Sequence, residues 1–262
     1  MKRKRYNFPF KLFFPLILIF LAIFLLIGYI WKVLTTSDFF SVKQVVVRNF
    51  DINLDYLKGR NIFNLDLDQQ SRRVFLACPD CRKVRFSRVL PNTVVVDFLK
   101  RQPVALVKFY KNFAVDEEGV FFYSLETGEE NRLPIIYGLE TKIFAPKPGV
   151  KYKRAELDLA LDIIREVGDN KSLKGFELKR IDAQNIESAG FFILMPKPAA
   201  GYIIPLQQEG ELGFEVRIGR GNIKQKIMIL GGLIIQARKD WGNIKYIDLR
   251  FKEPLIKLNN KL

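Results

Sequence analysis

The sequence contains no histidine and only two cysteines among its 262 residues. Without histidine, the chain by itself cannot build a Ser-His or Cys-His catalytic pair or a histidine-ligated metal centre. Two cysteines cannot close a four-cysteine zinc site or a scaffold that depends on several disulfides. Several classes of hydrolase and metalloprotein are therefore excluded before any motif is considered.

The composition is that of a folded protein with a basic surface. Hydrophobic residues make up 48% of the chain, charged residues 27%, and there are 23 phenylalanines. The length is enough for one or two domains with a real core. Lys and Arg number 43 against 28 Asp and Glu, a net charge of +15. Such a charge suits nucleic acid or an anionic membrane, and the topology of the chain has to decide between them.

Residues 12–32 are predicted to be a transmembrane signal anchor that follows a basic cytoplasmic tail at 1–11. Twenty residues without a charge run from Leu12 to Trp31, and as a helix they would cover about 30 Å, the thickness of the hydrocarbon core. A cleaved signal peptide is the alternative, but it would have a shorter apolar region and small residues at a cleavage site. The residues before the span are strongly basic: Lys2, Arg3, Lys4, Arg5 and Lys11. Basic residues that flank a membrane span lie preferentially on its cytoplasmic side. The N-terminus is therefore expected in the cytoplasm and the chain from about residue 33 outside it.

This placement removes the nucleic-acid interpretation. From Lys32 onward the chain keeps 38 basic and 28 acidic residues, and the basic ones are scattered along the chain. We expect a solvated basic surface close to anionic lipid rather than a specific site for an anionic ligand.

Residues 39–101 predict a small α+β domain with the order β-α-α-β-β. Residues 39–47 are rich in β-branched and aromatic side chains, which is typical of a strand. A short helical stretch at 51–57 would close at Gly59, and Asp66 is placed to cap a second helix. Strands at 84–90 and 94–99 would complete a three-stranded sheet with both helices on one face.

Residues 102–258 predict a β-rich domain with an extended mixed or antiparallel sheet and two helices. The first helix is expected from Arg154 to Val167, ended by Gly168, and the second begins at Asn222. The strands are expected at 104–110, 112–115, 120–122, 176–182, 191–195, 202–206, 214–218 and 255–258. The fold class is therefore α+β, with a single transmembrane helix before two domains.

Cys78-Pro79-Asp80-Cys81 is the sharpest local motif. Outside the cytoplasm such a pair can form a local disulfide or act in redox chemistry. A thioredoxin-like site would open a helix, whereas this motif follows a predicted helix and precedes a strand. We interpret Cys78 and Cys81 as a disulfide or free thiol pair that holds the loop. A redox or wall-modifying enzyme acting through them is the weaker alternative.

No other motif indicates catalysis. The acidic pairs at 117–118 and 129–130 lie beside turn glycines, as solvated loop charges do. Gly219-Arg220-Gly221 lacks the full dinucleotide-binding pattern and the Lys-Ser/Thr of a P-loop, and is interpreted as a turn. We therefore predict a binding protein that is not an enzyme and that has no cofactor and no metal.

The order of several motifs resembles the FtsQ/DivIB family of bacterial cell-division proteins. The resemblance is carried by Arg88-Val89-Leu90-Pro91-Asn92-Thr93-Val94 with Arg101-Gln102-Pro103-Val104-Ala105, and by segments 59–66, 133–138 and 246–251. It identifies residues 39–101 as a POTRA domain, residues 102–258 as an FtsQ-type β domain and residues 259–262 as a short tail. Asn49 replaces the usual glycine, but asparagine tolerates the left-handed conformation. Lys100 stands where the family often has an acid, and segment 196–213 fits least well.

The resemblance implies a bitopic scaffold of the divisome at the division septum. It would lie in the cytoplasmic (inner) membrane with its bulk in the periplasm, and no nucleic acid would bind. It implies FtsB and FtsL as partners, bound by β-strand addition to the last strand, and other divisome components bound through the POTRA domain. The partner-binding residues carried over from the family are Phe251, Glu253, Leu255, Ile256 and Lys257.

Two alternatives remain open at this point. The last strand could simply seal the edge of the core. The chain could also be a transport-associated POTRA protein that serves secretion or outer-membrane assembly as a binding or chaperone module; the single POTRA unit and the N-terminal anchor argue against it.

Overall fold

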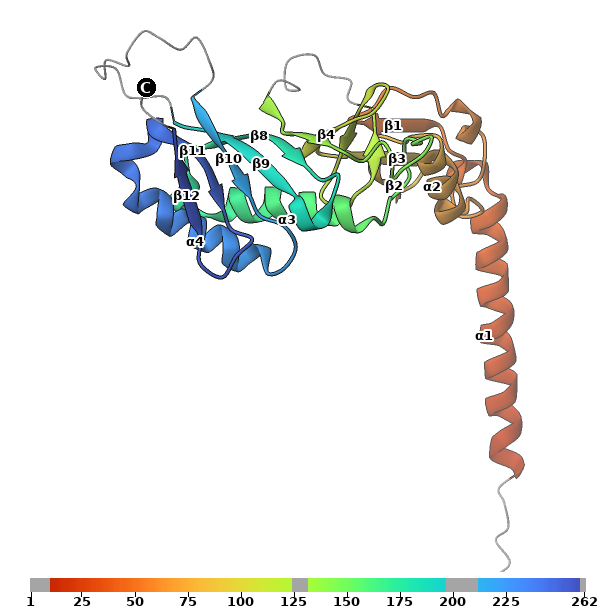
Figure 1. The fold of residues 1–262 in the computed structure, drawn as a ribbon. Coiled ribbons are helices and arrows are strands. Elements are labelled where there is room, and N and C mark those ends of the chain that lie inside the picture. Colours follow the sequence, from red (N-terminus) through yellow and green to blue (C-terminus); the bar gives the residue numbers. More distant parts are fainter. Residues whose placement is uncertain (1–9, 124–131, 197–211, 260–262) are drawn as a thin grey trace, which may run out of the picture. The chain divides into compact units, whose positions relative to one another are not determined.

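A computed structural model describes residues 10–123, 132–196 and 212–259. These residues form two compact units. The first unit extends to Ala77 and includes Cys81–Lys100, and the second contains Cys78–Asp80 and everything from Arg101 onward. The chain is α+β, as predicted, and each unit is built on its own sheet (Figure 1).

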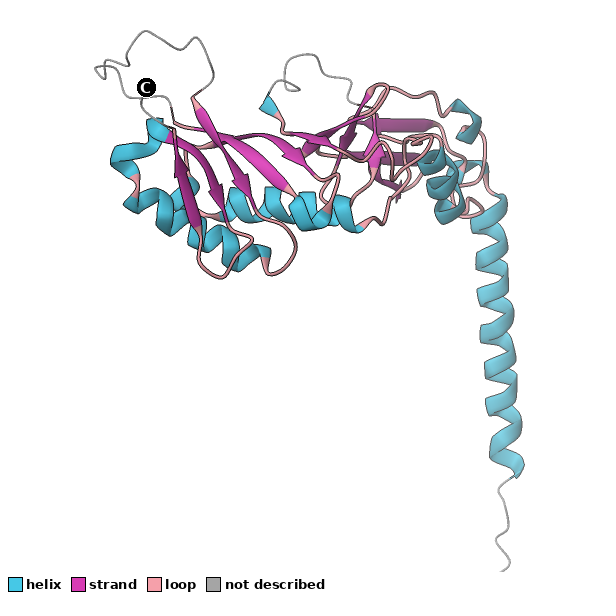
Figure 2. Cartoon of the chain, viewed as in Figure 1, coloured by secondary structure: helices cyan, strands magenta, loops and turns pink. Residues whose placement is uncertain are grey.

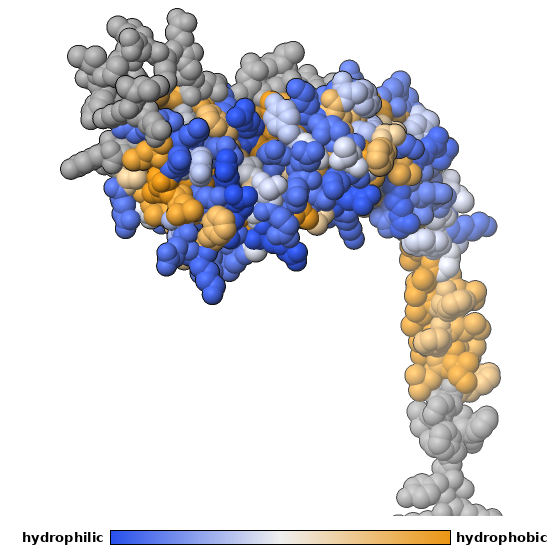
Figure 3. Space-filling model, viewed as in Figure 1, coloured by the Kyte–Doolittle hydropathy of each residue, from blue (hydrophilic) through white to orange (hydrophobic). Residues whose placement is uncertain are grey.

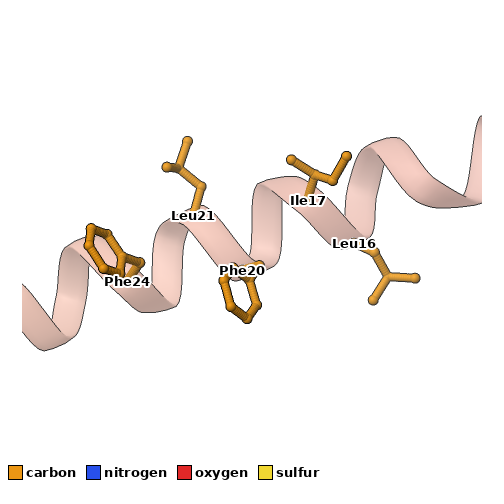
Figure 4. Close-up of a pocket in the computed structure, with 5 residues that line it drawn as sticks. All are labelled: Leu16, Ile17, Phe20, Leu21 and Phe24. Carbon is orange, nitrogen blue, oxygen red and sulfur yellow. The ribbon is translucent and has the colours of Figure 1, made fainter.

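The apolar N-terminal segment forms one helix, α1 (Phe10–Thr36). Residues 14–36 of this helix are long and apolar enough to cross a membrane, and no other helix among the described residues is. The side chains of Leu16, Ile17, Phe20, Leu21 and Phe24 project from the helix with only shallow gaps between them (Figure 4). Figure 3 shows this helix as an apolar surface. Such a surface suits lipid, in agreement with the predicted span at 12–32.

The sheet of the first unit has three strands in the order β1 (Gln44–Arg48), β3 (Thr93–Lys100) and β2 (Cys81–Val89). β1 runs parallel to β3, and β2 runs antiparallel to it. Along β3, Val94, Val96 and Phe98 are buried while the residues between them are not. Helix α2 (Leu67–Leu76) covers the sheet (Figure 2). Asp66 caps this helix as predicted, because its Oδ1 accepts a hydrogen bond from the Gln69 amide at 3.0 Å.

Two predicted elements of the first unit are shorter than the sequence suggested. The first helix is a single 3₁₀ turn, η2 (Asp55–Leu57), whose entry is set by Asn53 Oδ1 accepting from the Asp55 amide at 2.8 Å. The first strand begins at Gln44, because Asp38–Phe40 forms the 3₁₀ turn η1, with the Ser37 side chain accepting from the Phe39 amide. Serine and asparagine side chains that bond to nearby amides favour turns over strand or helix. Asn49 adopts the left-handed conformation, with φ of 64°.

The second unit contains a nine-stranded mixed sheet. The strand order is β12-β11-β10-β9-β8-β7-β4-β5-β6. The pairs β4–β7, β7–β8 and β10–β11 are parallel and the others antiparallel. The strands are β4 (Ala105–Lys108), β5 (Asn112–Val115), β6 (Phe121–Phe122), β7 (Ile135–Tyr137), β8 (Glu177–Asp182), β9 (Gly190–Leu194), β10 (Gly213–Arg217), β11 (Ile244–Asp248) and β12 (Leu255–Leu258).

Helices α3 (Ala155–Asp169) and α4 (Ile223–Gln236) cover one face of this sheet (Figure 1). Leu157, Ile163 and Leu230 are fully buried in the core between the helices and the sheet. The described part of the unit also contains the 3₁₀ helices η4 (Lys171–Leu173), η5 (Ile186–Ser188) and η6 (Arg238–Asn243).

The structure corrects the predicted end of α3. Gly168 does not stop the helix, which continues to Asp169. The helix ends where Asn170 takes an extended conformation and its side chain accepts from the Ser172 amide, which starts the next turn. The cap of α4 is confirmed, since Asn222 Oδ1 accepts from the Gln225 amide at 3.1 Å.

The strand predicted at 202–206 lies outside the described residues. The elements on either side of that segment, β9 and β10, are antiparallel neighbours, with Gly213 opposite Leu194. The strand at 202–206 therefore stays a prediction.

Candidate functional site

The last strand, β12, lies at the end of the nine-stranded sheet. It pairs antiparallel with β11, with Leu255 opposite Asp248, Ile256 opposite Ile247 and Lys257 opposite Tyr246. Within the ranges that the structure describes, no strand pairs with its other side. An edge strand of this kind presents main-chain N–H and C=O groups to an incoming segment.

All four residues of β12 are exposed. Leu255 is 56% exposed, Ile256 38% and Leu258 46%, whereas Ile247 in the neighbouring strand is fully buried. A strand with one face on a core would alternate between buried and exposed residues. Because β12 does not alternate, its burial gives no support to the alternative that it seals the core.

The turn from β11 to β12 is held by a pair of charged residues. The Asp248 carboxylate is buried and accepts from Arg250 Nε at 2.9 Å and from Arg250 Nη2 at 2.6 Å. It also accepts from the Arg250 amide at 3.1 Å. These hydrogen bonds, led by the one from the guanidinium, hold the pKa of Asp248 below its usual value. The turn therefore has a defined shape when it presents the residues that follow.

The structure brings to this one edge the five residues for which the family resemblance predicted partner binding. Phe251 and Glu253 lie exposed in the turn, and Phe251 is 59% exposed with the Arg250 guanidinium 5.8 Å from its ring centroid. Leu255, Ile256 and Lys257 lie in β12 itself. Successive side chains of a strand point to opposite faces, so Leu255 and Lys257 share one face and Ile256 lies on the other. A segment added along β12 would meet both faces.

Helix α4 also contributes to this region, which the sequence did not predict. A shallow groove of about 280 Å³ runs beside the turn. It is lined by Asn222, Gln225, Lys226, Ile229, Leu249, Phe251, Lys252 and Pro254. Half of these residues come from the cap and first turns of α4, and no local motif in the sequence predicts that they meet the last turn of the sheet.

Lys226 holds the start of α4 beside the segment that precedes it. Its Nζ donates to the main-chain oxygens of Ile218 and Arg220 at 2.6 and 2.7 Å. Burial lowers the pKa of Lys226, while the carboxylates of Asp248 and Glu187 act in the opposite direction. The two carbonyl contacts close the Gly219-Arg220-Gly221 segment, in which both glycines have positive φ, as a turn.

The two cysteines are disulfide-bonded to each other. Cys78 is 3% exposed and Cys81 1% exposed. Catalytic thiols are typically accessible and lie in electropositive surroundings, so this burial favours a structural role over redox chemistry. In the described ranges, no group of His, Cys, Asp or Glu is arranged to hold a metal ion.

Comparison with known proteins links the chain to one group. It is 23% identical over 233 residues to a protein of Syntrophotalea carbinolica named cell division protein FtsQ, covering 86% of this chain and 76% of that protein. It is 24% identical over 238 residues to a protein of the same name from Geotalea daltonii, covering 87% of this chain and 80% of that protein. No protein-family profile matches the chain.

A shorter similarity has higher identity. The chain is 31% identical over 104 residues to cell division protein FtsQ of Myxococcus fulvus, covering 40% of this chain and 36% of that protein. The two longer similarities extend over most of the chain, so they include residues of both compact units.

Proposed function

We propose, from the premise that this chain is a member of the FtsQ family of cell-division proteins, that it acts as a scaffold of the division machinery at the septum. A single-pass membrane protein with a binding edge can link other subunits without performing chemistry. We propose a non-catalytic role with FtsB- and FtsL-like partners, and further divisome contacts through the first unit.

The proposed orientation places the basic N-terminal tail in the cytoplasm and both compact units in the periplasm. The charge difference across the apolar helix supports this orientation. Both units then lie where the extracytoplasmic segments of small membrane partners can reach them.

The observation that carries the proposal is the exposure of β12. Its four residues are exposed, and it stands at the end of the sheet with three large apolar side chains. An extended partner segment could pair with its main chain and cover Leu255, Ile256 and Leu258 at the same time. Both the hydrogen bonds and the apolar burial would then stabilise the complex.

The first test changes Ile256 in the full-length chain. Ile256→Lys should place a charge in the apolar contact, and Ile256→Pro should remove a main-chain donor. Each should weaken capture of co-expressed FtsB- and FtsL-like proteins by at least about tenfold, or about 1.4 kcal/mol.

Val89→Lys is the matched control for this test. Val89 is also a β-branched residue, 49% exposed, on an edge strand, but it belongs to the smaller sheet of the first unit. Val89→Lys should capture both partners normally. Normal capture by a folded Ile256→Lys chain would exclude β12 as the partner edge.

Cellular position provides a second test, independent of any partner. A fluorescent protein fused to the N-terminus should form a band at mid-cell in dividing cells, and deletion of residues 252–262 should weaken the band. A uniform envelope signal throughout the cycle would instead favour the transport-associated alternative.

Unchanged function of a Cys78→Ser, Cys81→Ser variant would remove the redox alternative.

A further inference from the structure

The C-terminal end of α1 is capped by side chains from a distant loop of the first unit. Asn61 Nδ2 donates to the Leu34 carbonyl at 2.9 Å, and Asn64 Nδ2 donates to the Thr35 carbonyl at 3.1 Å. The last four carbonyls of a helix have no partner within the helix. Two of those in α1 are therefore satisfied by tertiary contacts.

The neighbouring carbonyls are satisfied locally. The Ser37 amide donates to the Val33 carbonyl at 3.0 Å, and Thr36 Oγ1 donates to the Lys32 carbonyl at 2.7 Å. Unpaired main-chain groups are costly in the hydrocarbon core of a bilayer, where no water can bond to them. The carbonyls from Lys32 to Thr35 are therefore all paired where the spanning helix reaches the membrane surface.

The capping loop is itself fixed to the sheet of the first unit. Arg88, in β2, donates to the main-chain oxygens of Ile62 and Leu65 at 2.8 and 2.6 Å. Ile62 is fully buried and Leu65 is 4% exposed. Asn61 Oδ1 accepts from the Phe63 amide at 2.9 Å, which orients the Asn61 side chain. The contacts run continuously from the sheet to the end of the spanning helix.

An aromatic group lies at the same place. The Ile62 amide donates to the Phe40 carbonyl at 2.9 Å, so η1 is joined to the capping loop. The rings of Phe39 and Phe40 pack edge to face at 5.0 Å, and those of Phe40 and Phe63 at 5.2 Å. Phe39 nevertheless remains 61% exposed, three residues after the helix ends. A large exposed ring at this distance from a membrane span fits the interfacial layer of lipid better than water.

We propose that the end of α1, η1 and the loop Asn61–Asn64 form one membrane-docking surface. This surface fixes the first unit to the outer headgroup layer of the bilayer, with Phe39 inserted in that layer. The partner is the lipid interface, since the surface is continuous with the helix that spans the bilayer. The inference requires α1 to cross the membrane, but it does not depend on which proteins bind β12.

The fixed geometry can be tested in the full-length chain in lipid nanodiscs. Spin-labelled unnatural amino acids at Leu26 in α1 and Arg85 in β2 would report the distance between helix and sheet by pulsed electron resonance. The wild-type chain should give one narrow distance distribution. Asn61→Asp with Asn64→Asp should broaden it, because an ionised carboxylate of nearly the same shape cannot donate to a carbonyl.

Asn53→Asp is the matched control in the same unit. The Asn53 side chain accepts a hydrogen bond from the Asp55 amide, so an aspartate can replace it while adding one negative charge, as Asn64→Asp alone does. Its distance distribution should stay narrow. If the paired variant fails to fold, Asn64→Asp alone removes only the Thr35 contact and should broaden the distribution less. Equal widths in all variants would overturn the proposal of a fixed junction.

The insertion of Phe39 needs a second measurement. A chain with Trp31→Phe, Trp241→Phe and Phe39→Trp carries a single tryptophan at the proposed contact. Lipids brominated near the headgroup should quench its fluorescence, whereas acrylamide in water should quench it weakly. A chain that retains only Trp31, within the apolar helix, is the positive control. Strong quenching by acrylamide alone would show that residue 39 lies in water.

Discussion

Asp248 and Arg250 stand two residues apart in the chain and form a closely bonded pair over the last turn of the sheet. Asp248 is 3% exposed, and three donor groups of one arginine, the amide, Nε and Nη2, bond to its carboxylate. Those bonds stabilise the ionised form, which lowers the pKa of Asp248 in the folded protein. The residue therefore couples the stability of the second unit to pH.

The direction of this coupling follows from the sign of the shift. A carboxyl whose pKa is lower in the folded state stabilises the fold above its unfolded pKa of about 3.9. That stabilisation is lost as the pH falls through the lower, folded value. We expect the thermal midpoint of the second unit to fall on acidification below pH about 4, and Asp248→Asn to flatten that dependence while lowering stability at pH 7 by about 1.5–3 kcal/mol.

Asp55 is the control for this pH prediction. Its pKa is also lowered, first by a hydrogen bond from Lys58, but its side chain is exposed to solvent. Exposed ion pairs contribute little to stability, so Asp55→Asn should leave the acid profile of the second unit unchanged. Calorimetry of the full-length chain in detergent from pH 7 to 3 would measure both variants. A parallel pH profile in wild type and Asp248→Asn would contradict the assigned role.

At the scale of elements, the adjacent strands β11 and β12 differ in burial. Ile247 and Ile256 are direct partners across the pair. Ile247 is fully buried, and Ile256 is 38% exposed. The same residue type therefore supports the core in one strand and remains accessible in the other.

This difference predicts opposite effects of one substitution. Ile247→Ala should lower the free energy of unfolding of the second unit by about 2–5 kcal/mol, because it leaves a cavity. Ile256→Ala should lower it by less than about 0.5 kcal/mol but should weaken partner capture. Chemical denaturation of both variants, together with the capture assay, gives the comparison. A large stability loss from Ile256→Ala would mean that β12 is a core strand.

At the scale of the whole molecule, the predicted topology depends on charge at one end of one helix. Reversing the charge of Lys2, Arg3, Lys4, Arg5 and Lys11 to Glu should reduce the fraction of chains whose bulk crosses the membrane. Protease treatment of spheroplasts would measure this fraction, since the two compact units can be cleaved from outside only in the proposed orientation. Full accessibility of the reversed-charge chain would show that other features set the topology.

Local features of the sequence predicted local features of the fold well. Asp66 and Asn222 cap their helices as expected, because a cap needs only a side-chain oxygen and an amide three residues away. The spanning helix followed from an uninterrupted apolar run. Predictions also failed locally, at η1, at η2 and at Gly168, where short side-chain hydrogen bonds competed with the expected element.

From the sequence alone, an N-terminal membrane span, an α+β fold and a last strand at 255–258 could be predicted, because apolar runs, periodicity and turn residues act over a few neighbouring positions. The positions of these elements relative to one another within each unit came from the tertiary structure. It placed β12 at the end of the sheet with every residue exposed, brought Lys226 to the carbonyls of Ile218 and Arg220, and joined Asn61 and Asn64 to the end of α1. These contacts depend on strand order and on pairings between residues far apart in the chain, which arise when the whole core packs and which no local pattern encodes.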